Sequence, residues 1–212
     1  IELIHIFEDE WIEKQDIVKS IIKNKLGLIE NKMYARECII KEVDKEEALL
    51  FLMNNHLQEH IICKYFLGLY HNNDLVQLVG IGKPRFNKEY EWELLRSCSK
   101  IDLVVIGGFN KLMNHAIDAL NIDNIISYVD KRYFNGKGYK DWSLVNETSP
   151  NYFYMKDYQT RESRLKYQKH KIIEKEEDRN LTEWQIMQLK GYDRIWDCGN
   201  RTFDRGKNYA KN

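Results

Sequence analysis

An apolar strand, a glycine pair, an amphipathic helix and a second apolar strand follow one another in the middle of this chain. The apolar segments are residues 90–97 and 124–129, and the stretch 108–120 between them has the spacing of an amphipathic helix. A helix that begins just after glycines directs unpartnered backbone N–H groups toward one point, which attracts anions, phosphates above all. The sequence therefore predicts an anion or cofactor site, and the alternative is a tight turn that binds nothing. The predicted site residues are Val105, Ile106, Gly107, Gly108, Phe109 and Asn110.

The composition limits the class of protein. The chain has 212 residues, and its 33 Lys and Arg residues balance 33 Asp and Glu residues, so the net charge is zero. This balance argues against nucleic-acid binding by the whole surface and leaves only a local patch. No apolar run approaches the roughly 18 residues of a membrane-spanning helix, so no membrane association is expected. The 4 Cys residues form no C-x-x-C pair, which predicts a reduced, cytoplasmic protein.

Other patterns predict the remaining elements. Two apolar runs at 65–70 and 75–82 are joined by His71-Asn72-Asn73-Asp74, which predicts a hairpin. The charged stretch 161–190 is expected to be helical. Further strands are expected at 1–7, 38–43, 143–147, 151–156 and 192–198, and further helices at 8–26, 44–54 and near 135–141. This order predicts an α+β fold with a mixed sheet, in which the helix 108–120 crosses between two strands.

Five segments carry a family resemblance: Leu94–Cys98, Val105–Leu112, Ile126–Tyr139, Pro150–Tyr154 and Gly191–Gly199. They resemble a phage-encoded group with the GNAT (N-acetyltransferase-like) fold that is associated with very-short-patch-repair-type homing endonucleases. The phage Mom protein, a DNA adenine modifier, is a more distant analogue. The resemblance covers residues 36–203 and implies a mixed, mainly antiparallel sheet flanked by helices, with a basic helical insertion near 160–190 and a tail at 204–212.

The first 30 residues are similar to the last strand and helix of that group's nuclease module. The sequence shows no obvious partner strand for this segment. We therefore expect it to belong to a nuclease module that lies upstream of Ile1 and is a partner of the GNAT-like domain.

The resemblance also implies acyl-CoA as a cofactor. Acyl-CoA-using members carry Arg/Gln-x-x-Gly-x-Gly/Ala at the turn, whereas this chain has Val104 at the first position and Phe109 at the last. Of that motif only Gly107 remains, and a phenylalanine crowds the close approach that a small residue permits. The departure favours a non-catalytic role, although Gly107 and Gly108 still allow an anion nest.

Three side chains are predicted to act in catalysis: Asp130, Tyr139 and Arg96. Asp130 follows a buried strand at a sheet edge where ligands often bind, and it is expected to act as a general base unless it forms a structural pair with Arg132. Tyr139 stands where many GNAT proteins hold the tyrosine that protonates the leaving thiolate, and the alternative is core packing. Arg96 is the predicted phosphate ligand. Glu93, on the same strand, is expected to point to the opposite face unless a bulge intervenes.

A basic segment is the best candidate for DNA contact. Residues 161–171 hold five Lys or Arg residues against one Glu, and a helix would bring several of them to one face. The alternative is a solvated helix balanced by the acids of 174–178. The predicted nucleic-acid contacts are Arg132, Arg161, Arg164, Lys169 and Lys171.

Two cysteines and a histidine pair are weaker candidates. Cys98 and Cys198 have no base nearby in the sequence and are expected to be small buried hydrophobic residues. His56 and His60 are four residues apart but lack the acidic partners of a zinc helix, so no metal is expected.

Three functions remain open at this point. The first is a phage-type GNAT-like domain that acts on or binds DNA, as a nucleobase-modifying acyltransferase. The second is a non-catalytic DNA-recognition domain of a homing endonuclease, and the third is a small-molecule N-acetyltransferase. The degraded turn motif favours the second function, and the set of Asp130, Arg132 and Tyr139 favours the first.

Overall fold

A seven-stranded sheet forms the centre of the computed structural model, which describes residues 3–58, 61–157 and 160–206. The strand order is β2 (Ile39–Glu42), β3 (Tyr65–His71), β4 (Asp74–Gly82), β5 (Trp92–Ser99), β7 (Asn124–Asp130), β12 (Asn200–Gly206) and β8 (Ser143–Glu147). Neighbouring strands pair antiparallel except β5 and β7, which are parallel. The structure thus confirms the α+β class with a mixed, mainly antiparallel sheet.

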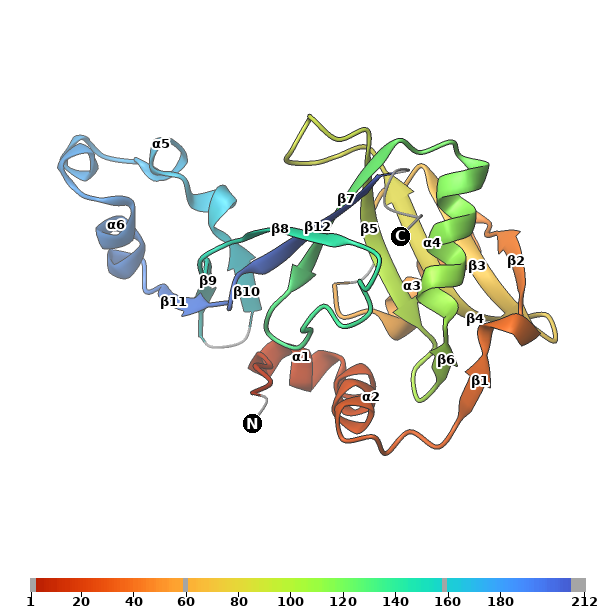
Figure 1. Ribbon diagram of the computed structural model, residues 1–212. Helices are drawn as coiled ribbons and strands as arrows, with labels where there is room; N and C mark the ends of the chain where they lie inside the picture. Colours follow the sequence, from red (N-terminus) through yellow and green to blue (C-terminus); the bar gives the residue numbers. More distant parts are fainter. Residues whose placement is uncertain (1–2, 59–60, 158–159, 207–212) are drawn as a thin grey trace.

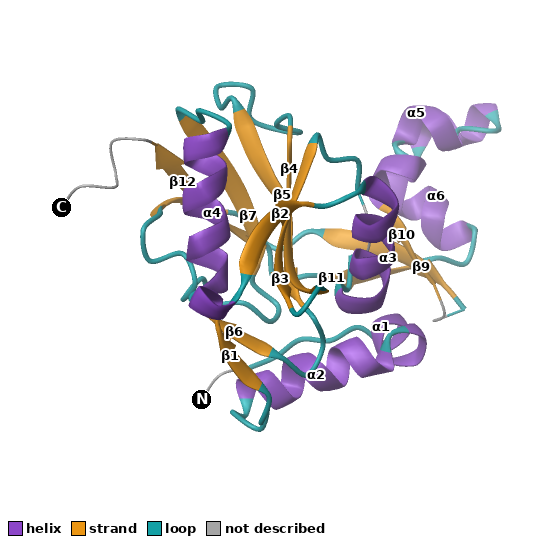
Figure 2. Cartoon of the chain, turned by 90° about the vertical axis from the view of Figure 1, so that its right-hand side faces the viewer, coloured by secondary structure: helices purple, strands orange, loops and turns teal. Residues whose placement is uncertain are grey.

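Helices cover both faces of this sheet. The parallel pair requires a crossover, and α4 (Gly108–Ala119) supplies it, burying Leu112, Met113 and Ala116 against one face. The helix α3 (Lys45–Asn55) buries Phe51 and Leu52 against the other. Figure 2 shows α4 and α3 on opposite sides of the strands. We call these the α4 face and the α3 face.

Local signals place these elements correctly. Asp44 caps α3 by accepting a hydrogen bond from the backbone N–H of Glu46 (2.8 Å), as its residue type predicts. The β3–β4 hairpin turns at Asn72 and Asn73, both with positive φ, which asparagine tolerates better than most residues. The helix expected over 8–26 ends before Gly27 as predicted but is broken at Lys14 into α1 (Glu8–Glu13) and α2 (Gln15–Lys25).

The N-terminal segment packs onto the domain. Residues 3–7 form no strand, so the expectation of one is wrong for the described part of 1–7. Phe7 and Val18 are buried, and Val18 lies in a cluster with Leu57 and Tyr133. The apolar stripe therefore has partners within this chain, and the upstream nuclease module stays a prediction.

A smaller sheet forms a lobe beside the main one, drawn in blue shades in Figure 1. Its order is β10 (Thr160–Ser163), β9 (Tyr152–Lys156) and β11 (Asp193–Trp196). Short helices cover it: η2 (Arg164–Tyr167), α5 (Lys169–Ile172), η3 (Glu176–Asn180) and α6 (Glu183–Leu189). The expectation of helix throughout 161–190 is wrong, because β10 and several breaks interrupt it.

Three further details differ from expectation. No helix forms at 135–141, where the chain makes turns instead. The strand β12 continues to Gly206, so residues 204–206 are part of the sheet rather than of a tail. A short parallel pair also forms, β1 (Lys32–Tyr34) with β6 (Val104–Ile106); β1 leads directly into the turn η1 (Ala35–Glu37), and β6 leads directly into Gly107. No helix in the described part of the chain is long and apolar enough to cross a membrane.

Candidate functional site

The sheet opens where β5 and β7 part. The two strands pair only from Trp92 opposite Ile125 to Leu94 opposite Ser127. On the other side of β5, Ile81 opposes Leu94 and Gly80 opposes Arg96, which leaves Leu95 as an extra, bulged residue. A bulge bends a strand and increases its twist. The strands therefore diverge, and a cavity of about 630 Å³ lies between them.

This cavity gathers part of the predicted site. Its walls come from α2, residues 55–58, β5, β7 and the loop 133–139. Five predicted residues line it: Arg96, Val105, Phe109, Asp130 and Tyr139. The predicted Ile106, Gly107, Gly108 and Asn110 are not among its lining residues.

Tyr139 lies on the α4 face of the cleft. Its hydroxyl is 2.9 Å from Ser127 Oγ, and its ring packs against Phe109 and Phe203 at centroid distances of 4.9 and 4.7 Å. Burial raises the pKa of Tyr139 to about 12, while the Ser127 hydrogen bond acts in the opposite direction. The phenol therefore stays protonated at neutral pH, as a proton donor requires. The ring thus has the core packing of the alternative interpretation, and the proton-donor role stays a prediction.

Arg96 lies on the α3 face. The bulge at Leu95 reverses the alternation along β5, so Arg96 and Glu93 share a face rather than pointing apart. Glu93 is fully buried and accepts hydrogen bonds from the Nε and Nη2 of Arg85 at 2.9 and 2.7 Å. Arg96 is 8% exposed and donates to the carbonyl oxygens of Leu95 and Gln58. Glu93 is thus a salt-bridge partner, and Arg96 is a cation held at the cleft.

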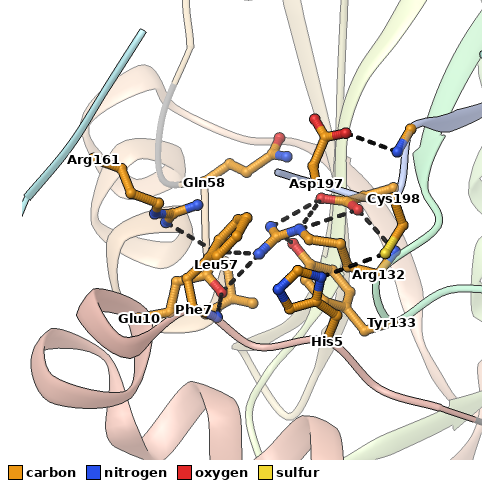
Figure 3. Close-up of polar contacts among 12 residues, drawn as sticks. His5, Phe7, Glu10, Leu57, Gln58, Arg132, Tyr133, Arg161, Asp197 and Cys198 are labelled. Carbon is orange, nitrogen blue, oxygen red and sulfur yellow. Dashed lines mark hydrogen bonds and ion pairs between the residues drawn. The ribbon is translucent and has the colours of Figure 1, made fainter. Parts of the chain in front are cut away.

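Asp130 and Arg132 form the structural pair that was the alternative interpretation. Arg132 is 4% exposed, and its guanidinium is 2.9 Å from both Asp130 Oδ2 and Glu10 Oε2. Burial alone would lower the pKa of Arg132, but Tyr133, Glu10 and Asp130 together raise it. Figure 3 shows this buried cluster at the junction with the N-terminal segment. Arg132 faces carboxylates inside the protein, which corrects the prediction that it contacts nucleic acid.

The basic segment is arranged differently from the predicted helix. Arg161 lies on β10, where it pairs with Asp9 (2.7 Å) and Glu10 (3.1 Å) and stacks over the Phe7 ring. Arg164 is in η2, and Lys169 and Lys171 are in α5, all three exposed. Arg161 therefore joins the lobe to α1, and it shares no helical face with the other cations.

Sequence reasoning missed a partner of Cys198. His5 Nδ1 lies 3.4 Å from Cys198 Sγ, and both side chains are partly exposed (Figure 3). The two residues are 193 positions apart, so no local pattern could have paired them. By contrast, burial raises the pKa of Cys98 to about 12.

The glycine turn has a defined geometry. Gly107 precedes α4 with φ of +78°, a conformation that favours glycine. A Cβ on Gly108 would collide with the side-chain amide of Gln77, so only glycine fits there without a shift. Lys111 ties this turn to the preceding segment by donating to the carbonyl oxygens of Ala35 (2.9 Å) and Cys38 (2.7 Å). The anion site at this turn stays a prediction.

Histidine, cysteine and acidic side chains do not gather into a metal-ligating group of three or more anywhere in the described residues. His60, the second member of the pair considered above, lies outside those residues, and His56 lines the cleft.

Comparisons with known proteins give structural neighbours only. No protein-family model matches the chain, and no curated protein matches its sequence. One solved structure, an IAA acetyltransferase from Bacillus cereus, is 11% identical with a TM-score of 0.40, over 80% of this chain and 99% of that one. Another is N-acetylglutamate synthase from Neisseria gonorrhoeae, complexed with coenzyme A and N-acetyl-glutamate. It is 11% identical with a TM-score of 0.42, over 80% of this chain and 35% of the synthase. Both neighbours are N-acetyltransferases of the GNAT fold.

Proposed function

We propose that this chain is an acyltransferase that holds an acyl thioester in the cleft between β5 and β7. The observation that carries the proposal is the Tyr139–Ser127 hydroxyl pair, 2.9 Å apart, on the wall of the cavity where the strands part. Beyond Leu94, the edge of β5 that faces β7 has no strand partner among the described residues. Such an edge binds extended, amide-containing ligands through backbone hydrogen bonds. Coenzyme A thioesters carry an arm of this chemistry.

The side chains then divide the chemical work. Transfer to an amine forms a C–N bond and breaks the thioester C–S bond. The sulfur that leaves takes up a proton, and the proton that the amine loses returns through solvent to the group that supplied it. The Tyr139 hydroxyl supplies the proton to the sulfur, and its pKa of about 12 keeps it loaded at neutral pH. Ser127 fixes the direction of the phenol. Asp130 is bound by Arg132 on the adjoining wall, so it positions the loop after β7 and does not act as the base.

Coenzyme A and acetyl-CoA binding tests the proposal, followed by transfer to a panel of amines with thiol release as the readout. We expect both compounds to raise the melting temperature of the wild type. Tyr139→Phe should keep this binding and lower thiol release by about 100-fold or more. Tyr34→Phe, which removes an exposed hydroxyl elsewhere, is the matched control. A melting temperature that neither compound changes would refute the proposal.

We also propose that the lobe contacts DNA, the partner that the family resemblance implies. Support comes from Arg164, Lys169 and Lys171, whose exposed side chains lie close together in sequence on η2 and α5. Three engaged cations give a slope of log affinity against log salt of about −2.7. Changing Arg164 and Lys171 to Gln should bring the slope to about −0.9, whereas Lys19→Gln on α2 should leave it unchanged. Anisotropy titrations at several salt concentrations measure it. A slope that the double variant does not change would remove this surface from consideration.

A further inference from the structure

A second pair of chemically reactive side chains lies outside the cleft. The imidazole of His5 and the thiol of Cys198 are in contact, with Nδ1 and Sγ 3.4 Å apart. Neither residue lines the cavity between β5 and β7, and both are partly exposed to solvent. A thiol beside an imidazole is the arrangement that cysteine nucleophiles use, because the imidazole takes the thiol proton.

The imidazole of His5 is held in one orientation by its neighbours. The backbone N–H of His5 donates to the carbonyl oxygen of Arg132 at 2.9 Å, and its ring meets the ring of Phe7 edge to face at a centroid distance of 4.9 Å. Phe7 is 1% exposed, and the guanidinium of Arg132 lies over its ring at 4.2 Å. Figure 3 shows this arrangement. Buried groups thus orient the base, which is the third part of a nucleophile and base arrangement.

The loop that carries Cys198 is fixed as well. Asp197 Oδ1 accepts hydrogen bonds from the backbone N–H groups of Asn151 (2.7 Å) and Gly199 (2.8 Å). Gly199 has a φ of +75°, and a Cβ there would collide with the carbonyl oxygen of Thr148, so the turn after the cysteine requires glycine. The thiol and the imidazole are therefore brought together by two well-anchored segments.

The pair adjoins the cleft through the loop that follows β7. The backbone N–H of Lys131 donates to the carbonyl oxygen of Gly199 at 3.0 Å, and the next carbonyl, that of Arg132, accepts the N–H of His5. Residues 133–139 of the same loop line the cavity. The pair thus lies beside the wall of the cleft that is proposed to hold an acyl thioester.

We propose that Cys198, with His5 as its base, accepts an acyl group from an acyl thioester. This inference rests on the proposed function for the class of acyl donor, and it assigns a second acyl-accepting group, on the protein itself. The thiol proton passes to His5 Nδ1, in the tautomer that carries its own proton on Nε2. The thiolate then attacks the carbonyl carbon of the thioester.

Bonds and protons balance in this exchange. The carbonyl carbon gains a C–S bond to Cys198 and loses its C–S bond to the donor, and the departing sulfur takes the proton from His5. The products are acyl-Cys198 and a free thiol. Because one thioester replaces another, the step needs no oxidant or further reactant, and an excess of free thiol reverses it.

Peptide mass spectrometry after incubation with a thioester tests the proposal. The probes are acetyl-CoA and S-acetyl-N-acetylcysteamine, which lacks the nucleotide. We expect both to place an acetyl group on the peptide that contains Cys198, and neutral hydroxylamine, which cleaves thioesters but not amides, should remove it. Cys38, Cys63 and Cys98 are internal controls in the same protein. An unmodified Cys198, or an acetyl group found only on lysine, would overturn the inference, even if iodoacetamide labels this thiol.

Variants test the role of the base. Cys198→Ser should lose the modification, and His5→Ala should acquire it about 100-fold more slowly, the lower end of what a general base contributes. Added imidazole should restore part of the rate in His5→Ala, which it would not do if the change had only disturbed the structure. His115→Ala, at an exposed position on α4, is the matched control. An unchanged rate in His5→Ala would overturn the proposal.

Melting curves check the folding of each variant, and the peptide map of the wild type decides the modified residue even if Cys198→Ser does not fold. The binding test with coenzyme A separates the two proposals. Coenzyme A binding with an unmodified Cys198 overturns only the present inference. Modification of Cys198 by the N-acetylcysteamine thioester without coenzyme A binding supports this inference and overturns the proposed function of the cleft.

Discussion

Replacing Glu10 by Gln should destabilise the protein strongly. The carboxylate is buried in α1 and accepts hydrogen bonds from Arg132 (2.9 Å), Arg161 (3.1 Å) and the backbone N–H of Phe7 (3.2 Å). One charge thus holds two guanidinium groups, one beside the end of β7 and one in the lobe. The Gln variant keeps the size of the side chain and removes that charge.

The surroundings set the size of the effect. Breaking a buried ion pair by removing one partner costs about 3–5 kcal/mol, because a charge stays buried without compensation. Arg132 keeps Asp130 and Arg161 keeps Asp9, so we expect the lower end, about 3 kcal/mol. Asp9→Asn is the matched control. Its pair with Arg161 is more exposed, so about 1 kcal/mol is expected there.

Urea denaturation of the two variants and the wild type, repeated from pH 7 to pH 3, measures both the size and its origin. Burial would raise the pKa of Glu10, but the hydrogen bond and charge of Arg132, followed by the charge of Arg161, lower it below its ordinary 4.5. The folded pKa lies below the unfolded one, so the stabilisation is complete above about pH 4.5 and is lost as the pH falls through the folded value. The gap between wild type and variant should close accordingly. A gap below about 1 kcal/mol at pH 7, or one that persists at acid pH, would refute the reasoning.

Two further predictions follow from side-chain geometry. Gly108→Ala should lower the free energy of unfolding by about 1–3 kcal/mol, because the added Cβ meets the side chain of Gln77. Gly138→Ala is the control and should be near neutral, because a Cβ there meets open space. Chemical denaturation compares the two variants, and equal stability would contradict the close contact at Gly108. Iodoacetamide should label Cys198 before the other cysteines, because Cys38 is buried and burial raises the pKa of Cys63 to about 11 and of Cys98 to about 12. His5→Gln should slow the labelling of Cys198, because it removes the imidazole in contact with the thiol. Peptide mass spectrometry gives the order, and first labelling at Cys63 or Cys98 would exclude the His5 contact as a source of reactivity.

Local features of the sequence predicted much of the fold. The hairpin at Asn72 and Asn73 and the glycine start of α4 each depend on a few adjacent residues, and the structure has both. The parallel pairing of β5 with β7 follows from the same logic, because a helix crosses between them. Local propensity failed at 135–141, where the chain turns with Gly136 at a φ of +80° instead of forming a helix.

The positions of several site residues depend on long-range contacts, which the spacing of residues in the sequence does not show. Arg132 was predicted to face nucleic acid, but Glu10, 122 positions earlier, holds it inside the protein. Arg161 was assigned to a helix face, but pairing of β10 with β9 places it beside Asp9. From the sequence alone, a charged side chain is expected to be exposed to solvent, because the sequence does not show its buried partner. Arg96 and Tyr139 were predicted with the help of the family resemblance, the first on a strand and the second in the loop after one, and both line the cleft.

The position of β12 has a consequence for synthesis of the chain on the ribosome. β12 lies between β7 and β8, so β7 finds its antiparallel partner only after residues 131–199 have been made. At 5–20 residues per second, this delay is roughly 3–14 s. During that interval the edge of β7, with the apolar Ile125 and Ile126, has no strand beside it. Nascent chains stalled before residue 200 should therefore bind chaperones that recognise unpaired apolar strands, and chains extended past Gly206 should not.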